Sequence, residues 1–122
     1  MSVAANLNVN NTDASPLTKN ASGTVTIGNN ATARAVLVTG DITVAGSFGV
    51  GATAATHTLT SGGNITNTGT INFAPTATRL CNVTFNENGN QAVSGAGAYT
   101  FNRMTLNMGA TRANTLDVQS AV

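Results

Sequence analysis

Apolar and polar residues alternate along this chain in short segments. Runs of three to five residues place apolar side chains at every second position, which is the spacing of a β-strand with one buried face. Glycine, asparagine and proline interrupt these runs, and no window repeats apolar residues at the spacing of a helix. The pattern predicts an all-β protein with short strands at 24–27, 35–38, 41–45, 47–50, 57–60, 64–66 and 70–73.

The segments recur at a regular interval of about 23 residues. Gly23-Thr24-Val25-Thr26-Ile27 is followed by Gly46-Ser47-Phe48-Gly49-Val50 and Gly69-Thr70-Ile71-Asn72-Phe73, and Gly40-Asp41-Ile42-Thr43 by Gly63-Asn64-Ile65-Thr66. Repeats of ~20–50 residues indicate solenoids, in which each unit buries its apolar side against its neighbours. We therefore expect a parallel β-solenoid (β-helix) with about 23 residues per coil, right-handed by the general preference of parallel crossovers.

The repeat gives each strand an inward and an outward face. Eight apolar residues are expected to point inward in stacked columns: Val25, Ile27, Ile42, Phe48, Val50, Ile65, Ile71 and Phe73. The hydroxyl residues Thr24, Ser47 and Thr70 are expected to point outward. Cys81, the only cysteine, has no internal partner and is expected to be a small buried apolar residue.

The chain divides into two regions. Residues 1–22 are expected to form an irregular initial segment or cap, and residues 23–122 the β-solenoid repeats. The register slips after Pro75, which cannot donate to a strand ladder and is expected at a corner or an edge. The interval then resumes, so that Val83 is expected to align with Leu106, and Val93 with Leu116.

Composition points away from several classes of protein. Charged residues make up 7% of the chain and the net charge is +1, so no concentrated basic face is available for nucleic acid. No apolar run approaches the ~18 residues of a membrane span. The 21 Thr favour strands, and the 13 Gly suit tight corners. A surface made polar by hydroxyls and amides indicates an extracellular or cell-surface location.

Two segments resemble a known family. Residues 83–95, VTFNENGNQAVSG, and residues 99–107, YTFNRMTLN, resemble a repeat of large secreted, adhesin-like surface proteins of Bacteroidota. Residues 40–44 and 63–73 resemble strands that follow this repeat in those proteins. The resemblance implies a β-helical stalk or fibre of an exported protein, with no catalytic residues and no cofactor. The chain departs from the family in length, because it lacks the many further repeats and the C-terminal sorting domain.

The ionisable residues are few and scattered. Only four carboxylate side chains occur, Asp13, Asp41, Glu87 and Asp117, and no two share a local motif. The single histidine, His57, has no nucleophile motif nearby and is expected to be an exposed corner residue. One histidine and one distant cysteine offer no metal site. We therefore expect no enzymatic activity, and tolerance of alanine at Asp41, Glu87 and His57.

Stacking at this interval also predicts two charged columns. Arg34 would align with His57, then with Leu80 beside Arg79, and then with Arg103, giving a partly cationic stripe. Such a stripe is usually just solvated, but it could contact an anionic surface polysaccharide. Asp41, Asn64 and Glu87 would form a second column. Calcium is the sharper alternative there, although the nonapeptide repeat that supplies its ligands is absent.

The expected role is structural. The strand Leu116–Val118 would leave an edge that no later residue covers, and the segment around Leu7 and Val9 is its expected counterpart. The expected partners are other copies of the chain or the rest of a longer chain, in a filament or an adhesive stalk. Two alternatives stay open: an antiparallel pilin-like sandwich, and an ice-binding solenoid with two parallel columns of Thr. The Thr24–Ser47–Thr70 column suits ice, but its neighbour Thr26–Gly49–Asn72 does not.

Overall fold

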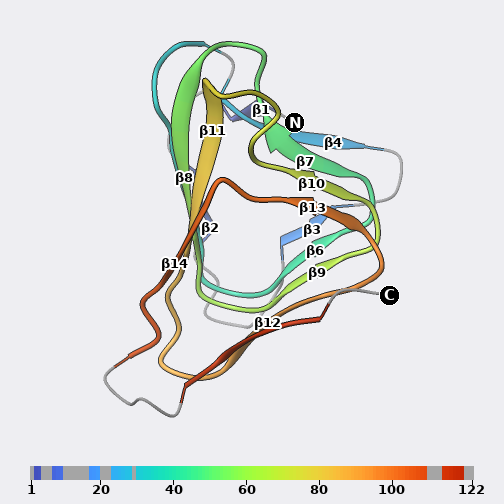
Figure 1. Cartoon of the computed structure of the whole chain (residues 1–122), viewed down its shortest axis with the longest axis vertical. Coiled ribbons are helices and arrows are strands. Elements are labelled where there is room, and N and C mark those ends of the chain that lie inside the picture. Colours follow the sequence, from blue (N-terminus) through green and yellow to red (C-terminus); the bar gives the residue numbers. More distant parts are fainter. Residues whose placement is uncertain are drawn as a thin grey trace.

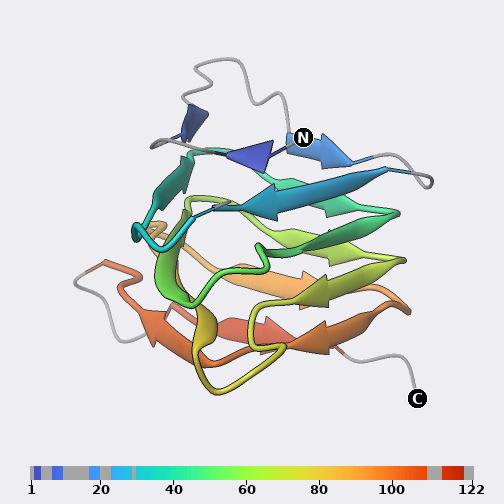
Figure 2. The same ribbon diagram turned by 90° about the horizontal axis from the view of Figure 1, so that it is seen from above.

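Three parallel β-sheets stack the chain into a solenoid. The computed structural model describes residues 2–3, 7–9, 17–19, 23–28, 30–109 and 114–119, the first three ranges by their backbone alone. Every strand pair in the described residues is parallel. Seen along the stack, the three sheets form the sides of a roughly triangular outline (Figure 1). Figure 2 shows successive turns lying on one another from the blue to the red end. The β-solenoid prediction is confirmed.

Each sheet contains five described strands. Sheet A has the order β1 (Ser2–Val3), β4 (Thr24–Ile27), β7 (Ser47–Val50), β10 (Thr70–Asn72) and β13 (Ala98–Thr100). Sheet B has the order β2 (Leu7–Val9), β5 (Ala35–Val38), β8 (Ala55–Ser61), β11 (Arg79–Phe85) and β14 (Arg103–Leu106). Sheet C has the order β3 (Leu17–Lys19), β6 (Ile42–Val44), β9 (Ile65–Asn67), β12 (Gln91–Ser94) and β15 (Leu116–Val118).

The repeat interval seen in the sequence sets the register of the central turns. Thr24 pairs with Ser47 and Ser47 with Thr70 in sheet A, and Ile42 pairs with Ile65 in sheet C. The interval is longer in the next turn, where Thr70 pairs with Ala98. The loop that contains Pro75 lies between β10 and β11, so the prediction that this proline sits outside the ladders is confirmed.

Two expected alignments in the last turn are wrong. Val83 pairs with Met104 rather than Leu106, and Val93 pairs with Val118 rather than Leu116. Each error is a shift of two positions, because the corners of the last turns differ in length from those of the central turns. A shift of two keeps each side chain on the same face of its strand, whereas a shift of one would reverse it. The predicted inward or outward direction of each side chain is therefore correct even where the predicted register is wrong.

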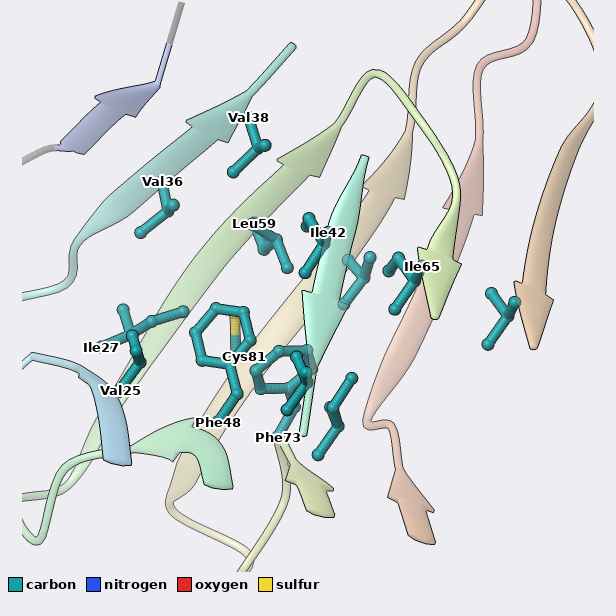
Figure 3. Packing of buried hydrophobic residues seen from close by; sticks show 14 of the residues in the cluster. Val25, Ile27, Val36, Val38, Ile42, Phe48, Leu59, Ile65, Phe73 and Cys81 are labelled. Carbon is teal, nitrogen blue, oxygen red and sulfur yellow. The ribbon is translucent and has the colours of Figure 1, made fainter. Parts of the chain in front are cut away.

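The apolar core fills the space between the sheets (Figure 3). All eight residues expected to point inward are buried, and Thr24, Ser47 and Thr70 are exposed, so that prediction is confirmed. The rings of Phe48 and Phe73 meet edge to face with centroids 5.1 Å apart, an arrangement that aromatic pairs favour. The core is narrow, because central strands such as β4, β6 and β7 each contribute only two buried side chains.

Residues 1–22 contribute three short strands to the stack. β1 pairs with β4, β2 with β5 and β3 with β6, each in parallel. The described parts of the segment expected as an irregular lead-in or cap thus continue all three sheets by one strand. The antiparallel sandwich, the alternative fold considered from the sequence, does not agree with these parallel ladders.

Candidate functional site

Two of the described carboxylates, those of Asp41 and Asp117, accept hydrogen bonds from nearby amide groups. Oδ1 of Asp41 accepts a hydrogen bond from the Asn64 backbone N–H at 2.7 Å, and Oδ2 of Asp117 accepts one from the Gln119 side chain at 2.6 Å. Within the ranges that the structure describes, no three His, Cys, Asp or Glu side chains gather as metal ligands would. The absence of enzymatic activity and of a cofactor stays a prediction.

The expected column of Asp41, Asn64 and Glu87 is only partly formed. Asp41 receives the Asn64 N–H, and Oδ1 of Asn64 in turn receives the N–H of Ala92 at 2.8 Å. Ala92 therefore stands where Glu87 was expected, and that alignment is wrong. These side chains form a ladder that extends the backbone bonding of a corner.

The expected cationic stripe is not formed. Arg34 does lie beside His57, because its backbone N–H donates to Nδ1 of His57 at 3.0 Å. The next residue in that column, however, is Cys81. Arg79 pairs with Ala55, and Arg103 pairs with Asn82, so these two cations occupy other columns.

His57 is buried, which corrects the expectation of an exposed corner residue. It is 1% exposed and lies on the same face of β8 as Leu59. The structure has no room for a Cβ at Gly28, because the His57 ring occupies that space. Since Nδ1 accepts a hydrogen bond from Arg34, the neutral imidazole must carry its proton on Nε2. Replacement of His57 by Ala, which the sequence predicts to leave function intact, should leave a cavity in the fold and the Arg34 backbone N–H without its acceptor.

Folding stability is expected to fall as the pH drops below neutrality. Burial and the nearby Arg34 charge lower the pKa of His57 from its ordinary value of 6.5. Protonation of His57 therefore favours the unfolded state. The contribution of the neutral ring to folding stability is fully present above pH 6.5 and is lost as the pH falls through the lower pKa of the folded state. His57 is the only histidine, so urea unfolding between about pH 7.5 and 5 should report mainly on this group.

The variant His57→Asn provides the matched control. The Asn side-chain oxygen can take the place of Nδ1 as the acceptor for Arg34, but it does not titrate. We expect the variant to lose less free energy of unfolding than the wild type over the same pH range. An equally steep loss in both proteins would contradict the assignment to His57.

Cys81 lies next to His57 in sheet B and is 0% exposed. Burial raises the pKa of its thiol to about 12, so the thiolate is not populated at neutral pH. The prediction of a buried small apolar residue is confirmed.

A hydroxyl column runs along the outer face of sheet A. Thr24, Ser47 and Thr70 pair in register and are all exposed. The adjacent outward column consists of Thr26, Gly49 and Asn72, which agrees with the sequence. The two parallel Thr columns that ice binding would use are therefore not present on this face.

The last described turn exposes apolar residues that belong to core columns. Met104 pairs with Val83, Leu106 with Phe85 and Val118 with Val93, and each of these earlier partners is buried. In contrast, Met104 is 44% exposed, and Leu106 and Val118 are each 57% exposed. We call these three residues the open-turn cluster. They lie in the last strands of their sheets, and no further described strand covers them.

Sequence reasoning found only part of this surface. Val118 was expected there, and Leu116 of the same strand is partly buried against the core. Met104 and Leu106 were missed because the constant interval misplaced β14. Their alternation with Arg103 and Thr105 could have indicated one apolar face. Leu7 and Val9 lie in β2, which pairs with Val36 and Val38 at the other end of sheet B.

The expected counterparts belong to different sheets. β15 is the last strand of sheet C, whereas β2 is the first strand of sheet B. If a second stack continues the first, β2 therefore meets β14, and β15 meets β3. In backbone register, positions 7 and 9 would then follow positions 104 and 106.

Comparisons with family models, with curated proteins and with solved structures found no match. Among the described residues, no helix is long and apolar enough to cross a membrane.

Proposed function

We propose that the chain is an extracellular structural element, a filament subunit or a segment of an adhesive stalk that is extended through its β-strand edges. The open-turn cluster carries this proposal. Three residues in core columns, Met104, Leu106 and Val118, are 44–57% exposed, although their counterparts one turn earlier are buried. Another β-solenoid turn placed on them would bury these side chains as the central turns bury theirs.

The arrangement of edges favours growth along the stack. β1, β2 and β3 are the first strands of the three sheets, and β13, β14 and β15 are the last. Because all ladders are parallel, a stack added at one edge with the same direction continues all three sheets at once. Such a head-to-tail contact is heterologous and does not close on itself, so it generates a filament. Further turns of a longer polypeptide would meet the same edges in the same way.

The composition supports a role outside the cell. Only 7% of residues are charged, compared with ~25% in typical soluble domains, and the outward positions carry hydroxyl and amide groups. Among the described ionisable residues, Asp41 and His57 accept hydrogen bonds from backbone N–H groups, a structural use that supports a scaffold.

Placing charges at two of the three residues of the open-turn cluster should abolish assembly. We expect the purified chain to form filaments with increasing concentration, visible by negative-stain electron microscopy and by sedimentation. Replacing Met104 and Leu106 together with Asp should keep the chain dispersed, since a carboxylate in a newly buried column has no partner. Both side chains are already exposed, so the isolated fold should persist, as far-UV circular dichroism can verify.

The variant Thr105→Asp is the matched control. Thr105 lies between the two apolar residues in β14 and is exposed on the outer face. Its substitution adds charge without entering a core column, and filaments should still form. Wild-type chain that stays monomeric at high concentration would exclude the filament form and leave the stalk segment. Filaments that survive the double substitution would exclude the open-turn contact.

A further inference from the structure

A groove lined by both apolar and polar residues lies on the outer face of sheet A, on strands other than those of the open-turn cluster. It has a volume of about 240 Å³ and is formed over β4, β7 and β10, with the loop that follows β10 as one wall. These three strands lie side by side along one side of the molecule (Figure 1). Six of its lining residues define its shape and chemistry: Thr26, Ser47, Gly49, Thr70, Pro75 and Arg79.

The floor of the groove is Gly49. It stands between Thr26 and Asn72 in the second outward column. A Cβ at this position would lie 2.9 Å from the Asn72 carbonyl oxygen, closer than ordinary van der Waals contact. The missing side chain leaves a depression between neighbours that do carry side chains. Beside it, the hydroxyls of Ser47 and Thr70 follow one another at the strand spacing of ~4.8 Å.

Arg79 forms the charged wall of the groove. Its Nε donates to the Gly51 carbonyl at 2.7 Å, and its Nη2 approaches the Val50 carbonyl at 3.5 Å. These contacts hold the guanidinium in place and use two of its five N–H donors. No carboxylate among the described residues pairs with it, and none lines the groove. Pro75 adds an apolar ring at the same wall.

We propose that this groove binds a short stretch of an acidic polysaccharide, one whose sugar units carry carboxylates. Arg79 binds a sugar carboxylate through its remaining N–H donors, since a fixed guanidinium suits the two oxygens of that group. The hydroxyls of Ser47 and Thr70 both donate and accept, as sugar hydroxyls do. Pro75 contacts the C–H face of a ring. This inference rests on the proposed adhesive role and names the ligand of that role.

The first test measures binding of a hexamer of galacturonic acid to the chain by isothermal titration calorimetry. We expect saturable binding that weakens with salt, and at least about tenfold weaker binding for Arg79→Gln, the loss of one charge-assisted contact. Arg103→Gln, which removes an exposed charge from the outer face of sheet B, should change the affinity less than twofold. Equal losses in both variants would show attraction to net charge alone and overturn the proposal.

A second variant separates shape from charge. Ser47→Leu fills the groove at an exposed position and leaves the net charge unchanged, so it should also weaken binding about tenfold or more if one good hydrogen bond and the space are lost. Maltohexaose, which has the hydroxyls but no carboxylates, should not bind measurably. Equal affinity for maltohexaose, no loss with Ser47→Leu, or no binding of the acidic hexamer at millimolar concentration would each overturn the proposal.

The saccharide-binding proposal and the assembly proposal can be tested independently of each other. The groove lies on β4, β7 and β10, whereas the open-turn cluster lies on β14 and β15. The double variant at Met104 and Leu106 should therefore bind the acidic hexamer with unchanged affinity. Filaments without saccharide binding would overturn this inference alone, and binding without filaments would overturn only the filament form.

Discussion

Replacing Ile65 with Asp is expected to lower the free energy of unfolding at neutral pH by about 3–5 kcal/mol. Ile65 is 0% exposed and lies in a column between Ile42 and Val93, both of which are buried. A carboxylate at this position would have no cation or hydrogen-bond donor among its column neighbours. An uncompensated buried charge costs about 3–5 kcal/mol, a large part of the ~5–15 kcal/mol that stabilises a typical domain. Urea unfolding followed by far-UV circular dichroism would measure the loss.

Thr66→Asp is the matched control for this substitution. Thr66 follows Ile65 in β9 but is exposed on the outer face, where it pairs with Thr43 and Ser94. The same carboxylate stays in water there, and we expect a change within about 0.5 kcal/mol, as for other surface substitutions. A similar loss in both variants would mean that β9 does not turn Ile65 inward and Thr66 outward.

The central turns could be predicted from the sequence because they repeat side-chain identity as well as polarity. The Gly-hydroxyl-apolar blocks at 23–27, 46–50 and 69–73 fix both the length of a coil and the face of each strand. Once Ile42 and Ile65 are placed in one column, alternation assigns their neighbours. Each remaining side chain of a strand then points either into the core or out to solvent, because successive residues of a strand face opposite sides.

The corners could not be predicted in the same way. A corner is satisfied by individual hydrogen bonds rather than by a repeated pattern, so its length can change without a change in strand pattern. The offset between paired residues grows from β9 to β12, where Thr66 meets Ser94, and shrinks from β11 to β14, where Val83 meets Met104. A constant interval therefore misaligned Arg79, Glu87, Arg103 and Leu106, and with them both charged columns.

His57 illustrates a signal that was present but misread. It lies two residues before Leu59 in an alternating segment, so period two places both side chains on the inner face. A histidine is more often exposed than buried, and that expectation displaced the alternation. The structure shows why burial is tolerated here: Nδ1 has a donor in the Arg34 backbone and the ring faces a glycine.

The candidate groove could not be inferred from the sequence, because its parts are distant along the chain. Gly49 provides the floor, but a glycine in a strand also suits a bulge or a tight bend. Arg79 lies on a later turn and reaches the groove beside a loop of irregular length. Only the three-dimensional arrangement places its guanidinium on the carbonyls of Val50 and Gly51.

Replacing Gly95 with Ala is expected to destabilise the stack by roughly 2–5 kcal/mol, from a left-handed backbone cost of about 1–2 and an overpacking cost of about 1–3. Gly95 has φ +104°, and an added Cβ would overlap the carbonyl of Asn67. That carbonyl cannot easily move, since it accepts the N–H of Gly97 at 2.9 Å. The buried Asn67 side chain also accepts the N–H of Gly69 and donates to the Ala98 carbonyl.

Gly89→Ala is the control, because its Cβ would meet only the Glu87 side chain at 3.8 Å. The midpoint of thermal unfolding should fall markedly for Gly95→Ala and stay unchanged for Gly89→Ala. Equal midpoints would mean that the corner after β12 is not held by Asn67.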